Sequence, residues 1–196
     1  MAGEALLIVD VQNDFCPGGA LAVPEGNLVV APLNRCAAHF ARRGAPVYAS
    51  RDWHPAVTAH FNTLGGPWPP HCVAGTAGAQ FHPDLRLPPA TVVVTKGDDP
   101  ARDGYSAFDG RTGDGVTLLD ELRRRQIDWL YVGGLATDYC VRQSVIDALA
   151  AGLCVSVLTD AVRAVEVRPG DGRRALEEMA RAGATFTTIR DLVEAG

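Results

Sequence analysis

One segment of the chain decides its fold: Trp129-Leu-Tyr-Val-Gly-Gly-Leu-Ala-Thr-Asp-Tyr-Cys-Val-Arg-Gln-Ser-Val-Ile-Asp-Ala-Leu-Ala-Ala-Gly152. It begins as an apolar run typical of a buried strand and then turns through two glycines. Val141, Val145 and Leu149 recur at helical spacing, which indicates a helix with one buried face. We expect Thr137 to be the N-cap of this helix and the final glycine to end it.

The predicted helix carries Cys140 in its first turn. Unpaired backbone N–H groups and the helix dipole stabilise negative charge at that position. We therefore expect a lowered thiol pKa and a cysteine that acts as a nucleophile at neutral pH. Such a thiol also needs a proton acceptor and a counter-charge from elsewhere in the chain.

Composition limits the possible classes of protein. The chain has 196 residues, of which 47% are hydrophobic, so we expect a single domain over residues 1–196. A net charge of −5 predicts no nucleic-acid surface. The apolar run at residues 5–9 is too short for a signal peptide or a membrane span. Five irregularly spaced cysteines indicate reduced thiols, and we expect a cytoplasmic protein with no membrane partner. Whether it forms a homo-oligomer stays open.

Strands and helices alternate along the rest of the chain. The apolar patterns predict strands at residues 5–9, 46–50, 90–95, 129–133, 153–158 and 185–188, and helices between residues 29 and 43, at 118–125 and at 172–182, with a last helical turn at the C-terminus. Pro32 must lie near the start of the first helix, because an interior proline removes a helical hydrogen bond. The pattern predicts an α/β fold, namely one doubly wound, three-layer α/β/α domain with a mainly parallel sheet of about six strands.

Polar residues follow the predicted strands, where ligands of such sheets bind. They are Asp10, Asp52, Lys96, Cys140 and Asp160. The long loop at residues 51–89 leaves the sheet at the same edge, and we expect it to form the roof of a binding site.

Asp10, Lys96 and Cys140 make up a first candidate group. A carboxylate and an ammonium group provide the proton acceptor and the counter-charge that a thiol nucleophile requires. The alternative is a structural ion pair beside a cysteine of the core. Among the other cysteines, Cys36 and Cys154 are expected in the core, while Cys16 and Cys72 lie in loops without a helix N-terminus to activate them.

Asp52, His54, His60 and His71 make up a second group, which predicts a metal site in the loop. One carboxylate with two or three imidazoles suits Zn²⁺, Fe²⁺ or Mn²⁺. The alternative is a set of surface histidines with an Asp52–Arg51 ion pair. His39 and His82 are expected to have ordinary structural roles.

The chain resembles the nicotinamidase/pyrazinamidase branch of the isochorismatase-like cysteine hydrolase superfamily. The resemblance rests on Leu7-Ile-Val-Asp-Val-Gln-Asn-Asp-Phe15, Ser50-Arg-Asp-Trp-His54, Gly66-Pro-Trp-Pro-Pro-His-Cys-Val-Ala-Gly-Thr76, Thr95-Lys-Gly97, Asp103-Gly-Tyr-Ser-Ala-Phe108 and Gly133-Gly-Leu-Ala-Thr-Asp-Tyr-Cys-Val141. These motifs cover nearly the whole chain. The motifs with the metal-binding residues occur in fewer branches of the superfamily than the motifs with Asp10, Lys96 and Cys140.

The resemblance implies the roles of the catalytic and metal-binding residues. Asp10 would be the general base, Lys96 its cationic partner and Cys140 the nucleophile. The implied metal ligands are Asp52, His54 and His71, with His60 as a fourth ligand used by some members, and zinc is the expected metal, with iron or manganese as alternatives. The implied reaction deamidates nicotinamide, and also pyrazinamide, through a thioester in NAD salvage.

The resemblance also implies the shape of the pocket. A cis peptide between Leu135 and Ala136 would help the backbone N–H groups of Ala136 and Cys140 to form an oxyanion hole. The residues that line the substrate pocket would be Phe15, Leu21, Trp68, Tyr105 and Ala136. Tyr139 stands where some relatives have histidine, and we expect it at the pocket edge.

Other functions remain to be distinguished. An amidohydrolase for carbamoyl or ureido substrates would not need the metal. Isochorismatase cleaves a vinyl ether without a nucleophilic cysteine, so Cys140 argues against it. A silent binding module is disfavoured by the complete set of candidate residues, and a redox role for Cys140 lacks a resolving cysteine.

Overall fold

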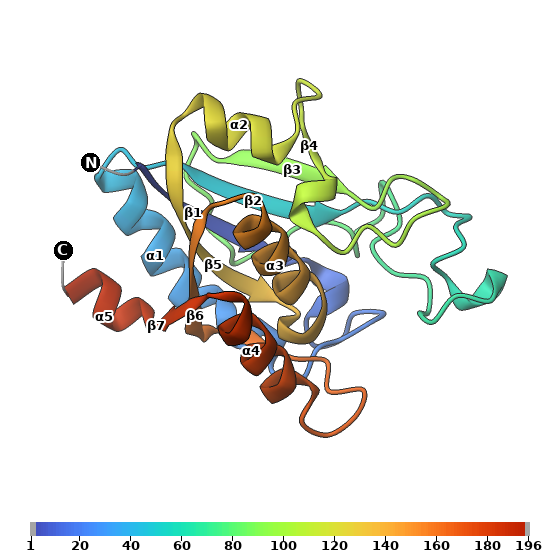
Figure 1. The fold of residues 1–196 in the computed structure, drawn as a ribbon. Coiled ribbons are helices and arrows are strands. Elements are labelled where there is room, and N and C mark those ends of the chain that lie inside the picture. The colour runs from blue at the N-terminus through green and yellow to red at the C-terminus, as the bar shows by residue number, and fades with distance from the viewer. Residues whose placement is uncertain (1–2, 195–196) are drawn as a thin grey trace.

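A seven-stranded sheet forms the centre of the computed structural model, which describes residues 3–194 (Figure 1). The strand order is β4-β3-β2-β1-β5-β6-β7. The strands are β1 (Gly3–Val9), β2 (Val47–Asp52), β3 (Val92–Lys96), β4 (Arg111–Thr112), β5 (Ile127–Leu135), β6 (Cys154–Arg163) and β7 (Thr185–Thr187). Only β4 is antiparallel to its neighbour.

Helices cover both faces of the sheet (Figure 1). Along β1, Leu6 and Ile8 pack toward α1 (Val30–Arg42) and α5 (Ile189–Glu194), while Leu7 and Val9 pack toward the opposite face. That second face is covered by α2 (Leu118–Arg124), α3 (Arg142–Ala150) and α4 (Asp171–Ala182). β1 is apolar on both faces and lies at the centre of the sheet, as its continuous run of apolar residues predicts.

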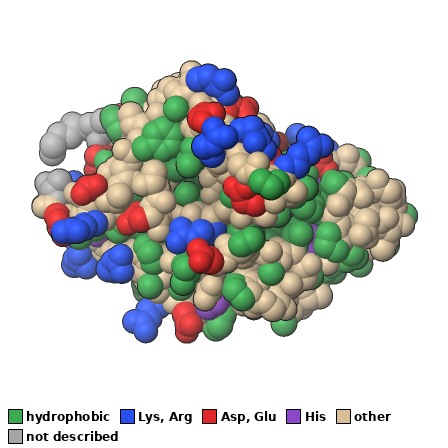
Figure 2. Space-filling view, turned by 90° about the horizontal axis from the view of Figure 1, so that it is seen from below, with side chains coloured by type: hydrophobic (Ala, Val, Ile, Leu, Met, Phe, Trp, Pro, Cys, Tyr) green, Lys and Arg blue, Asp and Glu red, His purple; other side chains and the backbone are tan. Residues whose placement is uncertain are grey.

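The predicted fold class is confirmed, and the predicted count of about six strands was one too low. The missed strand, β4, has only two residues, which is too short to show a period of two. Pro32 is the third residue of α1, near its start as expected. On the face drawn in Figure 2, Lys and Arg side chains lie beside Asp and Glu, so this face carries charges of both signs.

The two glycines of the deciding segment lie inside β5 and not in a turn, which corrects the prediction. Gly134 has φ +127°, and a Cβ atom on it would lie 2.1 Å from the Val9 carbonyl oxygen. Glycine at this position therefore lets β5 pass closely beside the end of β1.

The turn after β5 is π-helical over η5 (Thr137–Val141) and leads into α3. Thr137 is therefore not the N-cap. That position belongs to Ala136, which has no capping side chain.

Residues 53–91 connect β2 to β3 and contain one short helical turn, η3 (Asn62–Leu64). This loop begins later than predicted, because β2 continues through Arg51 to Asp52. Within residues 3–194, no helix has both the length and the hydrophobicity needed to cross a bilayer.

Candidate active site and metal centre

Lys96, the last residue of β3, is fully buried and joins the two predicted groups into one site. Its Nζ lies 2.9 Å from Asp10 Oδ2 and 3.5 Å from Cys140 Sγ. The same ammonium group donates to Asp52 Oδ1 and, at 3.0 Å, to the Gly104 carbonyl oxygen. A single buried cation therefore lies between two carboxylates and the candidate nucleophile.

The charge of this cluster decides which groups are ionised. Burial alone lowers the pKa of Lys96, but the carboxylates of Asp10 and Asp52 outweigh burial and raise it well above its usual value. Burial raises the pKa of Asp52, yet Lys96 and His54 lower it below its usual value on balance. Lys96 and Asp52 are therefore a charged pair.

Asp10 follows β1 directly and differs from Asp52 in the direction of its pKa shift. Its backbone has φ +48°, and Oδ1 accepts a hydrogen bond of 2.7 Å from Ser50 Oγ. Burial raises the pKa of Asp10, and Lys96 offsets this only in part. A carboxylate with a raised pKa is a stronger proton acceptor, which suits a general base.

Cys140 lies in the π-helical turn, and its thiol pKa is raised and not lowered as the sequence suggested. Burial is the largest cause, and Lys96 lowers the pKa only in part. The ligand atoms of Asp10, Asp52 and Cys140 lie within 4.8 Å of one another. The resting thiol is therefore protonated, and a carboxylate stands close enough to take its proton.

Three histidines of the loop between β2 and β3 converge beside Asp52. Potential ligand atoms of His54, His60 and His71 lie within 4.8 Å of one another, and all three side chains are buried. In each ring Nδ1 faces an oxygen, which is Gly97 O at 2.9 Å, Asp103 Oδ1 at 2.8 Å and Pro69 O at 2.8 Å, respectively. Each of these oxygens can accept a hydrogen bond from Nδ1–H, and in that tautomer the lone pair on Nε2 is free to bind a metal.

This arrangement fits a divalent transition metal. Among the described residues, His54 Nε2 is buried and has no hydrogen-bond partner, and it lies 3.7 Å from Asp52 Oδ2. Burial lowers the pKa of His71 to about 4 and also lowers that of His60, so both rings are neutral near pH 7. Three imidazole nitrogens and a carboxylate oxygen suit Zn²⁺, Fe²⁺ or Mn²⁺, and the oxygens on Nδ1 orient the rings as outer-sphere partners of metal sites do.

A narrow pocket opens beside these groups. Trp68 Nε1 donates to Tyr105 Oη at 2.9 Å, and the rings of Trp68 and Tyr139 meet edge to face. The lining residues are Phe15, Leu21, Asp52, His60, Trp68, His71, Tyr105, Ala136, Tyr139, Cys140 and Val165. The Leu135–Ala136 peptide is cis. The predicted pocket residues thus line one cavity with Cys140.

Other predicted residues lie elsewhere. Asp160 is inside β6 and does not follow a strand end; it accepts a hydrogen bond of 2.9 Å from Ile189 N, the first amide of α5. Cys36 is buried as expected, whereas Cys154, expected in the core, is exposed because it begins β6 at the rim of the sheet. His39 lies in α1, with Arg43 Nη1 at 3.2 Å from its Nε2.

Gln12 was not predicted, although it is fully buried beside Asp52. Its Oε1 accepts from Asp52 N, and its Nε2 donates to Asp52 O and Ala79 O, all at 2.8 Å. The carboxamide therefore satisfies the backbone of Asp52 and joins it to the far end of the loop. A polar Gln-Asn-Asp run directly after the first strand was the available signal.

Asp14, in the same Gln-Asn-Asp segment, also binds a backbone group of the loop between β2 and β3. Its carboxylate accepts from Cys72 N at 2.7 Å and from Ala20 N at 3.1 Å. The residue after His71 is thereby fixed to the loop that follows β1. Because both partners are backbone groups, their residue types carried no signal for this contact.

Comparison with known proteins agrees with this geometry. The chain matches the isochorismatase domain over residues 4–191. It is 45% identical to the nicotinamidase of Escherichia coli over 99% of both chains, and 42% identical to the nicotinamidase/pyrazinamidase of Mycobacterium tuberculosis over 91% of this chain and 95% of that protein. The pyrazinamidase of Pyrococcus horikoshii in complex with zinc superposes with a TM-score of 0.87 at 43% identity, covering 94% of this chain and 98% of that one. The chain belongs to the isochorismatase domain family.

Proposed function

We propose that this protein is a metal-dependent cysteine amidohydrolase that converts nicotinamide to nicotinate and ammonia, and also acts on pyrazinamide. The observation that carries the proposal is the contact of one ammonium group, Lys96, with Asp10, Asp52 and Cys140, beside three histidines whose potential ligand atoms lie within 4.8 Å of one another. This arrangement unites a base, a nucleophile and a cation in one pocket.

The residues support a two-step acyl transfer. Asp10 takes the proton of the Cys140 thiol as Sγ attacks the carboxamide carbon, and Lys96 stabilises the negative charge that develops in the cluster. The backbone N–H groups of Ala136 and Cys140 hold the tetrahedral oxyanion. Asp10 returns the proton to the leaving nitrogen, so that ammonia departs and a thioester remains. Water, deprotonated by Asp10, then cleaves the thioester to give nicotinate and the thiol.

The pocket suits a flat ring with one acceptor nitrogen. Phe15 and Trp68 offer aromatic faces to such a ring. The metal would be held by His54, His60, His71 and Asp52. When bound, it would act as a Lewis acid that binds and orients the ring nitrogen. Zinc is the metal that we propose, since the Pyrococcus horikoshii pyrazinamidase is a zinc complex.

The relatives support the choice of substrate. A protein called nicotinamidase matches this chain at 45% identity over nearly its whole length, and another relative is called nicotinamidase/pyrazinamidase. We infer from this that the protein serves NAD salvage in the cytoplasm. The loop between β2 and β3, which carries three of the four proposed metal ligands, would form the roof of the site within one domain.

Ammonia release from nicotinamide tests the proposal. Cys140→Ala should lower turnover by about a thousandfold or more, because the nucleophile is absent. Cys154→Ala, which changes an exposed cysteine in the same way, should match the wild type. Mass spectrometry of a quenched reaction should detect an acyl adduct in the wild type and in Cys154→Ala, but not in Cys140→Ala. Residual activity of Cys140→Ala within tenfold of the wild type would exclude the nucleophile.

Metal removal separates the proposal from a metal-independent amidase for carbamoyl or ureido substrates. Dialysis against a chelator should abolish nicotinamide hydrolysis, and Zn²⁺ should restore it. Full activity with less than one-tenth equivalent of bound metal would favour the metal-independent alternative.

A further inference from the structure

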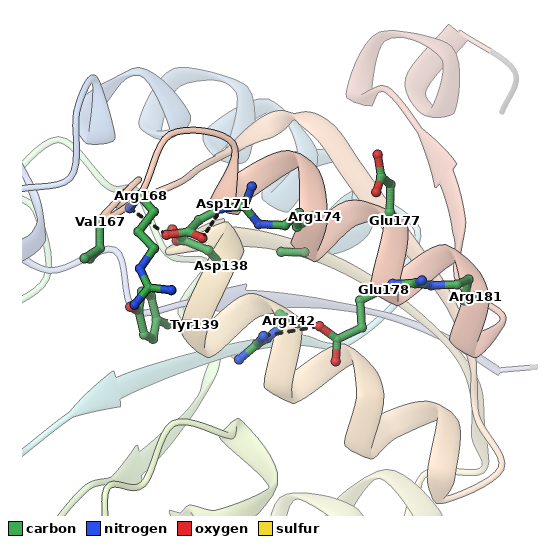
Figure 3. A pocket seen from close by; sticks show the side chains of 11 residues that line it. Asp138, Tyr139, Arg142, Val167, Arg168, Asp171, Arg174, Glu177, Glu178 and Arg181 are labelled. Carbon is green, nitrogen blue, oxygen red and sulfur yellow. Dashed lines mark hydrogen bonds and ion pairs between the residues drawn. The ribbon is translucent and has the colours of Figure 1, made fainter.

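The loop between β6 and α4, residues 164–170, forms a wall between the substrate pocket and an outer groove. Val165 lines the pocket, whereas Val167 and Arg168 line the groove. Tyr139 lines both cavities. Figure 3 shows the groove side of this wall, where Tyr139 and Asp138 of the η5 turn lie close to the start of α4.

A single side chain attaches this wall to the turn that carries Cys140. Asp138 is 5% exposed, and its Oδ1 and Oδ2 accept from Val165 N and Glu166 N, both at 2.9 Å. Both donors belong to the main chain of the wall, so the Asp138 carboxylate fixes its backbone as well as the direction of Val165. Asp138 lies two residues before Cys140, so the same turn positions the nucleophile and the wall.

The rest of the loop is held by hydrogen bonds to the start of α4. Glu166 has φ +58°, and its carboxylate accepts from Gly170 N and Gly172 N at the start of α4. The loop therefore has one anchor on α4 and one on the catalytic turn. Loss of the Asp138 anchor leaves the α4 anchor intact, so the expected result is a displaced wall in a folded protein.

We propose that Asp138 is a positioning residue that holds Val165 against the substrate, and that Val165 thereby determines which ring substituents the enzyme accepts. The proposal rests on the proposed hydrolysis of nicotinamide. A substituent that meets Val165 is rejected while the wall is held. Once the wall shifts, the pocket gains space toward the groove, and the same substituent is accepted.

The variants are chosen to move the wall by two routes. Val165→Ala shortens the side chain but keeps both backbone hydrogen bonds. Asp138→Asn keeps the size of the side chain, but its NH₂ group faces one of the two N–H donors and breaks that bond. Asp171→Asn is the matched control, because Asp171 Oδ2 accepts from Arg168 N in the same loop, so the carboxylate binds the loop from the α4 side.

The measured quantity is kcat/KM for each ring-methylated isomer of nicotinamide divided by kcat/KM for nicotinamide. Val165→Ala and Asp138→Asn should raise this ratio by about tenfold for the same isomer, since one methyl group in an apolar pocket changes specificity by roughly 10- to 200-fold. Asp171→Asn should leave the ratio unchanged. An unchanged ratio in either Val165→Ala or Asp138→Asn would overturn the proposal.

Amide hydrogen exchange provides a readout that needs no substrate. The amides of residues 165 and 166 should exchange faster in Asp138→Asn than in the wild type or Asp171→Asn, while β5 stays protected. Unchanged exchange would contradict the anchor, whatever the substrate. Two results together would contradict the proposed function and still support the anchor. The wild type would hydrolyse no nicotinamide, and the amides of residues 165 and 166 would nevertheless exchange faster in Asp138→Asn.

Discussion

Replacing Gln12 by alanine should destabilise the protein far more than the same replacement of its neighbour, Asn13. The two residues carry the same carboxamide chemistry. Gln12 makes three buried hydrogen bonds at 2.8 Å to Asp52 N, Asp52 O and Ala79 O. Asn13 makes one exposed hydrogen bond at 2.8 Å, to Ala77 O. The pair therefore separates buried from exposed polar contacts at adjacent positions.

The expected magnitude follows from these contacts. Each lost hydrogen bond at Gln12 leaves a buried backbone group unpaired, at a cost of about 1 kcal/mol or more, so Gln12→Ala should lower the free energy of unfolding by about 3 kcal/mol. At Asn13 water replaces the lost partner, and the loss should stay below about 1 kcal/mol.

Urea unfolding followed by fluorescence measures both variants. It should be run with a chelator present, because Gln12 also positions Asp52, a proposed metal ligand, and metal binding would add to the difference. The midpoint should fall strongly for Gln12→Ala with an unchanged slope. If the two variants differ by less than about 1 kcal/mol, the carboxamide of Gln12 does not have the structural role assigned to it.

Two further predictions concern the metal site and alkaline pH. Gly97→Ala should weaken Zn²⁺ binding by at least about tenfold in a competition titration, because the new Cβ would lie 2.6 Å from His54 Cε1. Gly75 also has a positive φ but has open space around it, so Gly75→Ala should leave Zn²⁺ binding unchanged. Equal effects of the two would indicate backbone strain alone. Burial raises the pKa of Tyr48 to about 12, so the folded state holds the phenolic proton longer than the unfolded state. The stability that this provides is present below pH 10 and is lost as the pH rises toward 12. Tyr48→Phe should therefore lose less stability than the wild type between pH 10 and 12 in urea unfolding, and parallel curves would contradict the assignment.

The regular part of the fold was predictable from apolar patterns. Buried parallel strands such as β1 and β3 are continuous apolar runs, and α1 repeats its apolar residues at helical spacing. The pattern failed where close contact between segments decided the structure. The pattern predicts a turn at Gly133 and Gly134, whereas both lie inside β5, because their sequence does not reveal how closely β5 passes β1.

The candidate site was predictable to the extent that strand ends meet at one edge of a parallel sheet. This topological rule predicts from the sequence that Asp10, Lys96 and Cys140 lie close together. It failed for Asp160, because β6 runs on to Arg163. The raised thiol pKa of Cys140 also escaped prediction, since burial is a property of the packed structure and not of a position on a helix.

Side chains that serve backbone groups were the hardest to predict. Gln12, Asp14 and Asp138 each accept from or donate to main-chain atoms far away in the sequence, and any residue type can offer those atoms. Their contacts appear only once the loops are placed. The resemblance of motifs pointed to the segments that contain these residues, but not to their partners.

The alignment of β2 with β3 has a consequence for protein engineering. Asp52 and Lys96 are direct partners in the register of these strands, so their salt bridge is set by the sheet. Inserting or deleting one residue within either strand would turn one of the two side chains to the opposite face. Length changes in stretches of residues 53–91 that carry no histidine leave this alignment intact. Grafting a different roof onto the scaffold should therefore be feasible, provided that the graft carries its own imidazoles and leaves both strands untouched.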